Sequence, residues 1–457
     1  MSSSVDSAER SPARSRASIL RRRVSLALVL TAASVGCYFW FWHAHLKRFH
    51  VVRSGVLYRT AQPTEFGMRW LVRQHGVKTV LSLQLYDFRL YRGYLDPGRP
   101  SGERESKYVA ALGAVPAQWA MGEEQSWPWL SPWQFEQFFK LFDDPGNWPV
   151  AVHCQGGRHR TGTVSALFRL EYDRWPVERT LEEMYSFKFG PPVRLQEKNL
   201  RTYLPRPRPS ETEWAELGRA WQARLGDKPL ADYDDLIRRL RAARGEPALE
   251  DALLKYVSQD RPFALPLAQR LIDRFDDPLA VAAAERAAAC LDRPEAGRAA
   301  WSSAAAVIAD FGALDQQQKL LACLGDAAFQ RASPERFDAV AAGAMNRYTP
   351  NRIAFLQPLL DNEACHLADG ARQCRYCDTA VARLSTMIDQ NLTHVTPAVG
   401  IDAWNFARQA AREWFAAHPC ERQLTRLLPP TGKSVVHAGD PIPREDLSKL
   451  ETNVTRH

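Results

Sequence analysis

The chain has 457 residues, of which 45% are hydrophobic and 25% charged, a balance typical of globular proteins with sizeable cores. This length is enough for two or three domains of roughly 100–200 residues each. The net charge of +8 comes without a long Lys/Arg run and without a zinc-finger or RNA-binding motif, so we expect no nucleic-acid partner. Its eight cysteines are too few for a disulfide-stabilised scaffold.

The N-terminal segment predicts a membrane anchor. Residues 1–23 form a polar tail rich in Ser and Arg, which we expect to be disordered. Residues 24–42 (VSLALVLTAASVGCYFWFW) are 19 uncharged positions that end in a cluster of aromatic residues, as in a helix that spans a bilayer with about 20 residues. A cleaved signal peptide is the alternative, but its apolar stretch is normally shorter and ends in small residues.

The charges around this span predict its orientation. Six arginines precede it, and positively charged residues collect on the cytoplasmic side of membranes. We therefore expect a single-pass protein with its N-terminus inside and the bulk of the chain extracytoplasmic. Residues 43–52 follow as a short basic connector.

Residues 53–205 alternate short apolar runs with amphipathic segments, which predicts an α/β domain with a central, mainly parallel sheet flanked by helices. Strands are expected within residues 55–63, 77–85, 114–121 and 149–154, and helices within residues 64–76, 102–113, 131–144 and 160–175.

The composition changes after the first domain. Residues 204–214 (LPRPRPSETEW) are Pro-rich and end in a helix-start signal, which indicates a linker and a fresh helix. Residues 211–428 are rich in Ala, Leu, Arg and Asp with few β-branched runs, so we expect an all-α domain, stacked as an irregular solenoid. The surface of such a helical array could bind a protein partner. Residues 429–457 read as a flexible tail.

One group of cysteines in the helical region is compatible with three different roles. Cys365, His366, Cys374 and Cys377 lie close together in the sequence and resemble half of a zinc site. A disulfide in an extracytoplasmic compartment and plain packing of thiols between helices are the alternatives.

The stretch VAVHCQGGRHRTG, residues 150–162, predicts an anion-binding loop. A strand ends at Cys154 and a helix begins near Thr161, so the loop between them turns its backbone N–H groups inward. Gly156 and Gly157 permit positive φ and close backbone approach, and the helix N-terminus adds partial positive charge. Arg160 can bind two phosphate oxygens, and the same positive field favours thiolate at Cys154.

These residues resemble a known family. HCQGGRHRTG, residues 153–162, is similar to the active-site loop of the cysteine-dependent protein tyrosine and dual-specificity phosphatases: His-Cys, five residues, Arg, Thr or Ser, Gly. The wider resemblance runs from about residue 56 to residue 204, is strongest to the compact atypical dual-specificity type, and covers roughly a third of the chain.

The resemblance implies a role for each matching residue. Cys154 would attack phosphorus to give a cysteinyl-phosphate that water hydrolyses, and Arg160 would clamp the phosphate. His153 would orient the loop, and Thr161 would hydrogen-bond the sulfur. No metal and no cofactor are implied. A buried structural thiol is the alternative reading of Cys154. The substrate-binding set comprises His153, Gln155, Gly156, Gly157, Arg158, His159 and Thr161.

The general acid departs from the family pattern. The family usually places an Asp about 30 residues before the cysteine, where it protonates the leaving oxygen. Here that segment reads WAMGEEQSWPW and offers Glu123 and Glu124 but no Asp. We prefer Glu124, with Asp87 or Asp96 as further candidates and two solvated loop glutamates as the alternative.

The predicted substrates are phosphate monoesters, namely phosphotyrosine and phosphoserine or phosphothreonine in proteins. Arg158 and His159 add positive charge inside the loop, either as solvent-facing residues or for highly anionic substrates, since lipid-phosphatase loops carry a similar extra basic residue. Phosphoinositides or inositol (pyro)phosphates are therefore alternative substrates. A membrane-tethered scaffold that binds phosphate without turnover is the non-enzymatic alternative.

Overall fold

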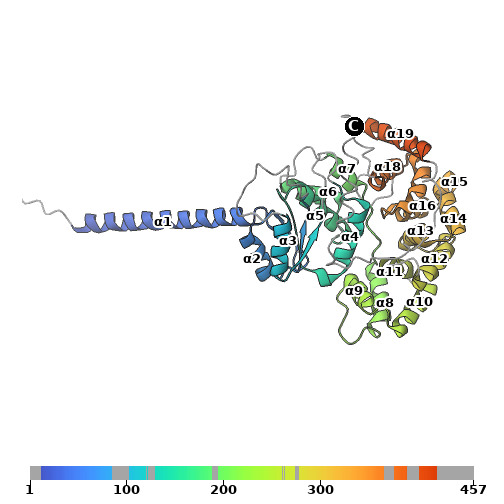
Figure 1. Cartoon of the computed structure of the whole chain (residues 1–457), viewed down its shortest axis with the longest axis horizontal. Coiled ribbons are helices and arrows are strands. Elements are labelled where there is room, and N and C mark those ends of the chain that lie inside the picture. Colours follow the sequence, from blue (N-terminus) through green and yellow to red (C-terminus); the bar gives the residue numbers. More distant parts are fainter. Residues whose placement is uncertain are drawn as a thin grey trace, which may run out of the picture.

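The computed structural model describes residues 12–84, 102–119, 121, 129–187, 194–259, 261, 263–272, 277–364, 375–388 and 401–418. A long helix, α1, extends away from an α/β unit, and a curved array of helices packs on the other side of that unit (Figure 1). The arrangement places the sheet between the long helix and the helical region.

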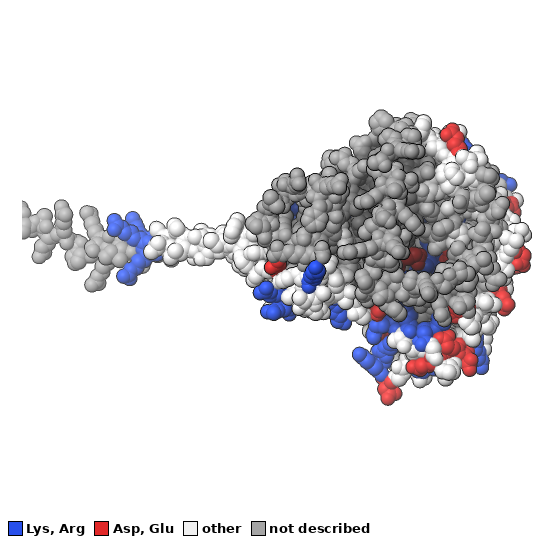
Figure 2. Space-filling model, viewed as in Figure 1, with Lys and Arg blue, Asp and Glu red and all other residues white. Residues whose placement is uncertain are grey.

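Helix α1 (Pro12–His45) contains the predicted span. Its portion Leu20–His45 is long and apolar enough to cross a membrane, a test that a signal sequence near the N-terminus also passes. Figure 2 shows basic side chains gathered near the start of the helix and an uncharged stretch that leads from them to the rest of the molecule.

The C-terminal end of α1 is packed against helix α2 (Glu65–His75). The ring centroids of Phe41 and Phe66 are 5.0 Å apart, and those of Trp42 and Trp70 are 4.7 Å apart. A Cβ at Gly67 would collide with the carbonyl oxygen of His45, so glycine allows this close approach. The long helix is therefore held to the α/β unit by aromatic contacts.

The sheet has the order β1-β2-β5-β3-β4. Its strands β2 to β5 pair in parallel, which confirms the mainly parallel sheet, and β1 pairs antiparallel with β2. Residues 50–52, which were predicted as part of a connector, lie in β1. The prediction missed this strand because a short edge strand with one buried position carries no clear sequence pattern. The strands are β1 (His50–Arg53), β2 (Leu57–Ala61), β3 (Thr79–Ser82), β4 (Val115–Gln118) and β5 (Val150–Cys154).

Helices cover both faces of the sheet. Successive residues of each strand therefore point into two different cores, one on each face. Tyr58 and Val80 share one core with Met68 of α2, whereas Leu81 and Val152 pack in the other. The helices of this unit after α2 are α3 (Gly102–Ala111), α4 (Pro132–Asp143), α5 (His159–Glu171), α6 (Val177–Ser186) and α7 (Arg194–Arg201), with a 3-10 turn η1 at Pro145–Asn147.

Local signals fix the ends of these helices where the sequence predicts them. Helix α2 begins after Thr64, whose side chain accepts from the Gly67 N–H, and ends at Gly76 in a left-handed conformation. Helix α4 begins with a capping box formed by Ser131 and Gln134.

The described residues after α7 fold into helices joined by turns and loops, in agreement with the predicted all-α region. Cys377, in α18, is buried, and the rest of its predicted cysteine–histidine group (Cys365, His366 and Cys374) lies outside the described residues. The helices are α8 (Glu211–Gln222), α9 (Tyr233–Ala242), α10 (Pro247–Ser258), α11 (Ala264–Leu271), α12 (Pro278–Leu291), α13 (Arg298–Phe311), α14 (Leu314–Gly325), α15 (Ala327–Ala332), α16 (Pro334–Met345), α17 (Ile353–Leu356), α18 (Tyr376–Met387) and α19 (Ile401–Ala417), with 3-10 turns at Pro350–Arg352 and Gln357–Asp361.

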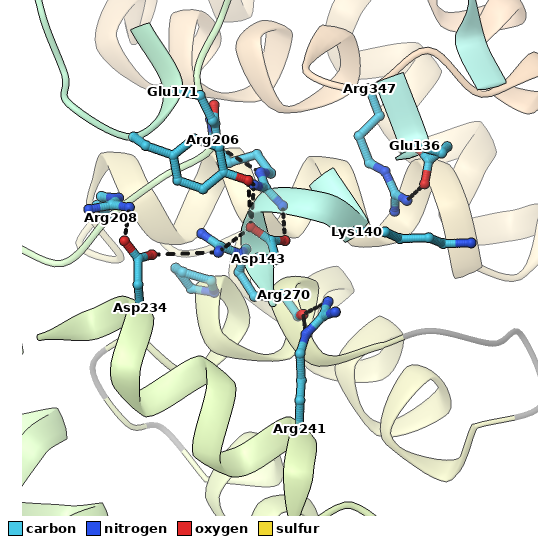
Figure 3. Close-up of polar contacts among 12 residues, drawn as sticks. Glu136, Lys140, Asp143, Glu171, Arg206, Arg208, Asp234, Arg241, Arg270 and Arg347 are labelled. Carbon is cyan, nitrogen blue, oxygen red and sulfur yellow. Dashed lines mark hydrogen bonds and ion pairs between the residues drawn. The ribbon is translucent and has the colours of Figure 1, made fainter. Parts of the chain in front are cut away.

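A buried charge cluster joins the two regions (Figure 3). Arg206, in the segment predicted as a linker, donates to both carboxylate oxygens of Asp143 at 2.8 and 3.0 Å and to Glu171 at 2.7 Å. Arg270 of α11 donates to Asp143 at 2.6 Å. This part of the segment is therefore packed into the core rather than extended as a tether.

The cluster keeps Asp143 ionised. Burial by itself would raise the pKa of Asp143, but Arg206 and Arg270 more than offset burial and hold that pKa well below its usual range. The stabilisation from Asp143 is therefore fully present above its unfolded pKa of about 3.9 and is lost as the pH falls further.

We expect Asp143→Ala to lower the free energy of unfolding by about 3–5 kcal/mol, because it leaves Arg206 and Arg270 buried without their shared carboxylate. Urea denaturation of the purified chain at neutral pH measures this. The matched control is Asp361→Ala, since the Asp361–Arg412 pair has side chains that are 71% and 43% exposed and contributes less than about 1 kcal/mol. Equal effects of the two variants would contradict the role of the cluster.

Candidate active site

The predicted strand–loop–helix arrangement is present around Cys154. Strand β5 ends at Cys154, which is 5% exposed, and helix α5 begins at His159. The parallel register places Ala61 of β2 beside Cys154, and the Leu83 N–H donates to the His153 carbonyl at 2.9 Å from the other neighbouring strand. The thiol therefore sits at the carboxyl end of the central strand, where parallel sheets place their ligand sites.

The loop after Cys154 folds back over the end of β2. The Gln62 N–H donates to the Gln155 carbonyl at 3.2 Å. Gly157 has φ +63°, and a Cβ there would lie 2.6 Å from the Ala61 nitrogen, so a residue with a side chain does not fit. Gly156 is different, because its Cβ would meet only Arg158 Cγ, at 4.0 Å.

Two arginines that the sequence analysis missed hold the carbonyls of this loop. Arg48 Nη1 donates to the Gly156 carbonyl at 2.6 Å, and Arg59 Nη2 donates to the Gly157 carbonyl at 2.9 Å. Because both carbonyls are bound from outside the loop, its amide N–H groups are left to line the inner side. The sequence carried no signal for either contact, since both arginines lie about a hundred residues before the loop.

Arg59 is a buried cation behind the loop. It is 1% exposed, and its guanidinium lies 3.9 Å from the centroid of the Phe187 ring. Burial lowers the pKa of Arg59 to about 10, although Glu183 and Cys154 act in the opposite direction. The group is therefore positively charged at neutral pH, as suits a loop that binds an anion.

His153 belongs to a buried polar chain. His153 Nε2 lies 2.9 Å from Glu105 Oε1, and both side chains are buried. Gln62 Nε2 donates to Glu105 Oε2 at 2.6 Å, and Gln84 Nε2 donates to Gln62 Oε1. The chain connects β5, α3 and the ends of β2 and β3, which suits His153 to the orienting role that the resemblance implies.

The basic residues of the loop differ in exposure. Arg158 and Arg160 are partly exposed and His159 is exposed. Although the His159 side chain reaches solvent, partial desolvation of its ring, followed by the charges of Arg158 and Arg160, lowers the pKa of His159, so the ring is mostly neutral at pH 7. Burial and the charge of Arg158 likewise lower the pKa of Arg48. Arg48, Arg158 and Arg160 together give this end of the sheet a positive field.

Thr161 stands in the first turn of α5. Its side chain is fully buried, and its Oγ1 atom has no hydrogen-bond partner. The hydrogen bond to the Cys154 sulfur that the resemblance implies is therefore not formed in this structure. The four candidates for the general acid, Glu123, Glu124, Asp87 and Asp96, lie outside the described residues.

A comparison with family models agrees with this geometry. A model described as the tyrosine phosphatase family matches residues 107–206, a range that includes β5, the loop and α5. Among curated proteins, the chain is 42% identical over 59 residues to OCA1 of Mycosarcoma maydis, which is named as a tyrosine-protein phosphatase. The match covers 13% of this chain and 37% of that relative.

Solved structures give weaker likenesses. The core catalytic domain of the PP-IP phosphatase SIW14 from S. cerevisiae is 20% identical, with 35% of this chain and 86% of that chain covered and a TM-score of 0.28. P. aeruginosa TpbA is 20% identical, with 31% and 75% covered and a TM-score of 0.24. By the family model and the curated relative, the α/β unit around Cys154 belongs to the cysteine-based tyrosine and dual-specificity phosphatase family.

Proposed function

We propose that the protein is a phosphatase that hydrolyses phosphate monoesters of phosphotyrosine and of phosphoserine or phosphothreonine. The observation that carries this proposal is the position of Cys154 at the carboxyl end of β5, directly before the loop held by Gly157 and the N-terminus of α5. Such a site combines a nucleophile with an oxyanion-binding loop.

The proposed reaction has two displacements at phosphorus. The Cys154 sulfur forms a bond to phosphorus while the ester P–O bond breaks, and the leaving oxygen takes a proton from a general acid, for which Glu124 remains our candidate. Water then attacks phosphorus and gives a proton to the carboxylate that acted as the acid, the S–P bond breaks with its electron pair returning to sulfur, and inorganic phosphate leaves. Arg160 and the loop amides stabilise the charge that develops on the phosphate oxygens in both steps.

We further propose that α1 anchors the protein in a membrane, with the bulk of the chain extracytoplasmic. The anchor and the loop are close in the structure. Helix α1 ends at His45, and Arg48, three residues later, donates to the Gly156 carbonyl. The loop would therefore lie near the membrane surface.

This closeness favours a second candidate substrate class, phosphoinositides or inositol (pyro)phosphates. Arg48, Arg158 and Arg160 together surround the loop with more positive charge than one phosphate requires, and a substrate with several phosphates would use it. Arg48 keeps further N–H donors besides the one that binds Gly156.

We expect the full chain in detergent to hydrolyse p-nitrophenyl phosphate, and Cys154→Ser to lower kcat by roughly 10³-fold or more, because a serine hydroxyl is a far weaker nucleophile than a thiolate. Steady-state release of p-nitrophenolate measures this. The control is Cys323→Ser, which changes a half-buried thiol in α14. If the wild-type chain shows no turnover but binds phosphate, the scaffold alternative stands instead.

We expect Gly157→Ala and Gly156→Ala to differ, although the two glycines are neighbours. An added methyl at Gly157 collides with the backbone of β2 and is strained at positive φ, so the loop must move. We predict a fall in melting temperature equivalent to about 1–3 kcal/mol, together with loss of turnover, for Gly157→Ala. Thermal unfolding should leave Gly156→Ala near the wild type, and a neutral Gly157→Ala would be inconsistent with the described loop.

We expect Arg48→Met to change substrate preference if polyphosphorylated lipids are substrates. Loss of a guanidinium–phosphate contact would lower kcat/KM for a phosphoinositide in vesicles by about tenfold more than for p-nitrophenyl phosphate. Arg73→Met is the matched control, since Arg73 is an exposed arginine of α2. Equal losses on both substrates would mean that Arg48 only holds the Gly156 carbonyl.

A further inference from the structure

A second polar site lies at the junction of the α/β unit and the helical region. A cavity of about 240 Å³ is lined from both sides, by residues of α4 and by residues of α9, α11, α13 and the turn after α16. Phe139, Ile272 and Phe311 form an apolar wall of this cavity. An apolar cavity of about 150 Å³ holds benzene, so this one has room for a ring and a charged group.

The carboxylates that line the cavity are already paired. Asp143 accepts from Arg206 and Arg270, as described above. Asp310 accepts from Arg352 through Nε and Nη2, both at 2.7 Å, and from Arg347 at 3.0 Å. Glu136 accepts from Arg347 at 2.8 Å.

One buried residue that lines the cavity, by contrast, has a hydrogen-bond donor without a partner. Gln269 lines the cavity and is 7% exposed, and its Nε2 atom has no hydrogen-bond partner. The next residue, Arg270, is not part of the lining, but its Nε and Nη1 atoms are also buried without a hydrogen-bond partner. A buried donor without an acceptor costs free energy, which a ligand that supplies acceptor oxygens would recover.

Lys140 adds a positive charge to the lining of the cavity. It is exposed, and Figure 3 draws its amine without a contact to the other labelled residues. The lining holds four cations (Lys140, Arg206, Arg241 and Arg347) and three carboxylates (Glu136, Asp143 and Asp310), which leaves a net charge of 4 − 3 = +1. The cavity therefore offers an unpartnered donor, a net positive charge and apolar side chains.

We propose that this cavity binds a small organic anion of the phosphate monoester class, at a site separate from Cys154. Its phosphate accepts from Gln269 Nε2 and pairs with Lys140, and its apolar group packs on Phe139, Ile272 and Phe311. Because the lining comes from both regions of the chain, the bound ligand connects them and stabilises the folded protein.

The test uses the full chain with Arg160→Met, so that phosphate binding at the proposed active site is weakened and the probe is not consumed. Phenyl phosphate should raise the melting temperature in a saturable manner, and phenol, which lacks the anion, should not. Gln269→Leu and Lys140→Met should each weaken the apparent affinity by about tenfold, the loss expected for one charge-assisted hydrogen bond. Lys255→Met, which removes an exposed lysine of α10, is the matched control.

Gln269→Glu is the second variant. It keeps the size of the side chain and replaces the amide donor with a carboxylate, so phenyl phosphate binding should be lost through charge repulsion, while thermal unfolding reports whether the variant is folded. The proposal is overturned if phenyl phosphate gives no saturable shift at millimolar concentration. It is equally overturned if Gln269→Glu binds phenyl phosphate as tightly as the control Lys255→Met does.

Discussion

The geometry around Cys154 depends on one close backbone contact, that of Gly157 with the end of β2. Parallel pairing sets Ala61 beside Cys154, so a loop that returns to α5 must pass directly over the last residues of β2. A left-handed residue without a side chain can do so. This placement also explains the hydrogen bonds from Arg48 and Arg59 to the loop carbonyls. The two arginines can reach the loop because it lies against the end of β2.

The helical region is part of the same folded body as the α/β unit. Leu236 of α9 and Leu253 of α10 belong to the same continuous core as Leu81 and Val152 of the sheet. The buried carboxylate of Asp143, on α4, takes a partner from α11. Since a buried charge requires its partner, the α/β unit would lose part of its own charge compensation without these helices.

Much of the fold could be predicted from the sequence, because it rests on local signals. Alternating strand and helix patterns, the Ser131 cap and the HCQGGRHRTG stretch each depend on neighbouring residues, and the sheet and loop appear where they indicated. The contacts that support the loop could not be predicted in this way. Glu105, which meets His153 at a sequence distance of 48 residues, looks like any surface acid until the fold brings the two together.

Segment 204–214 is a second place where contacts distant in the sequence could not be predicted from local patterns. Its prolines indicate a break in regular structure, and the helix that follows begins with the predicted cap at Ser210. Composition does not say whether such a break is solvated or packed. Arg206 is buried there because Asp143 and Glu171, 63 and 35 residues away, provide its ion pairs.

The short path from α1 to the loop limits how the site can turn. The Lys47 carbonyl accepts from the Ala61 N–H at 2.7 Å and from Thr60 Oγ1 at 3.2 Å, and the next residue, Arg48, grips Gly156. Hydrogen bonds from β2 and to the loop therefore tie down the short connection between the proposed anchor and the nucleophile. An enzyme built in this way would hold its active site at a nearly constant height above the bilayer. It would then act on those substrates whose phosphate lies at that distance from the lipid.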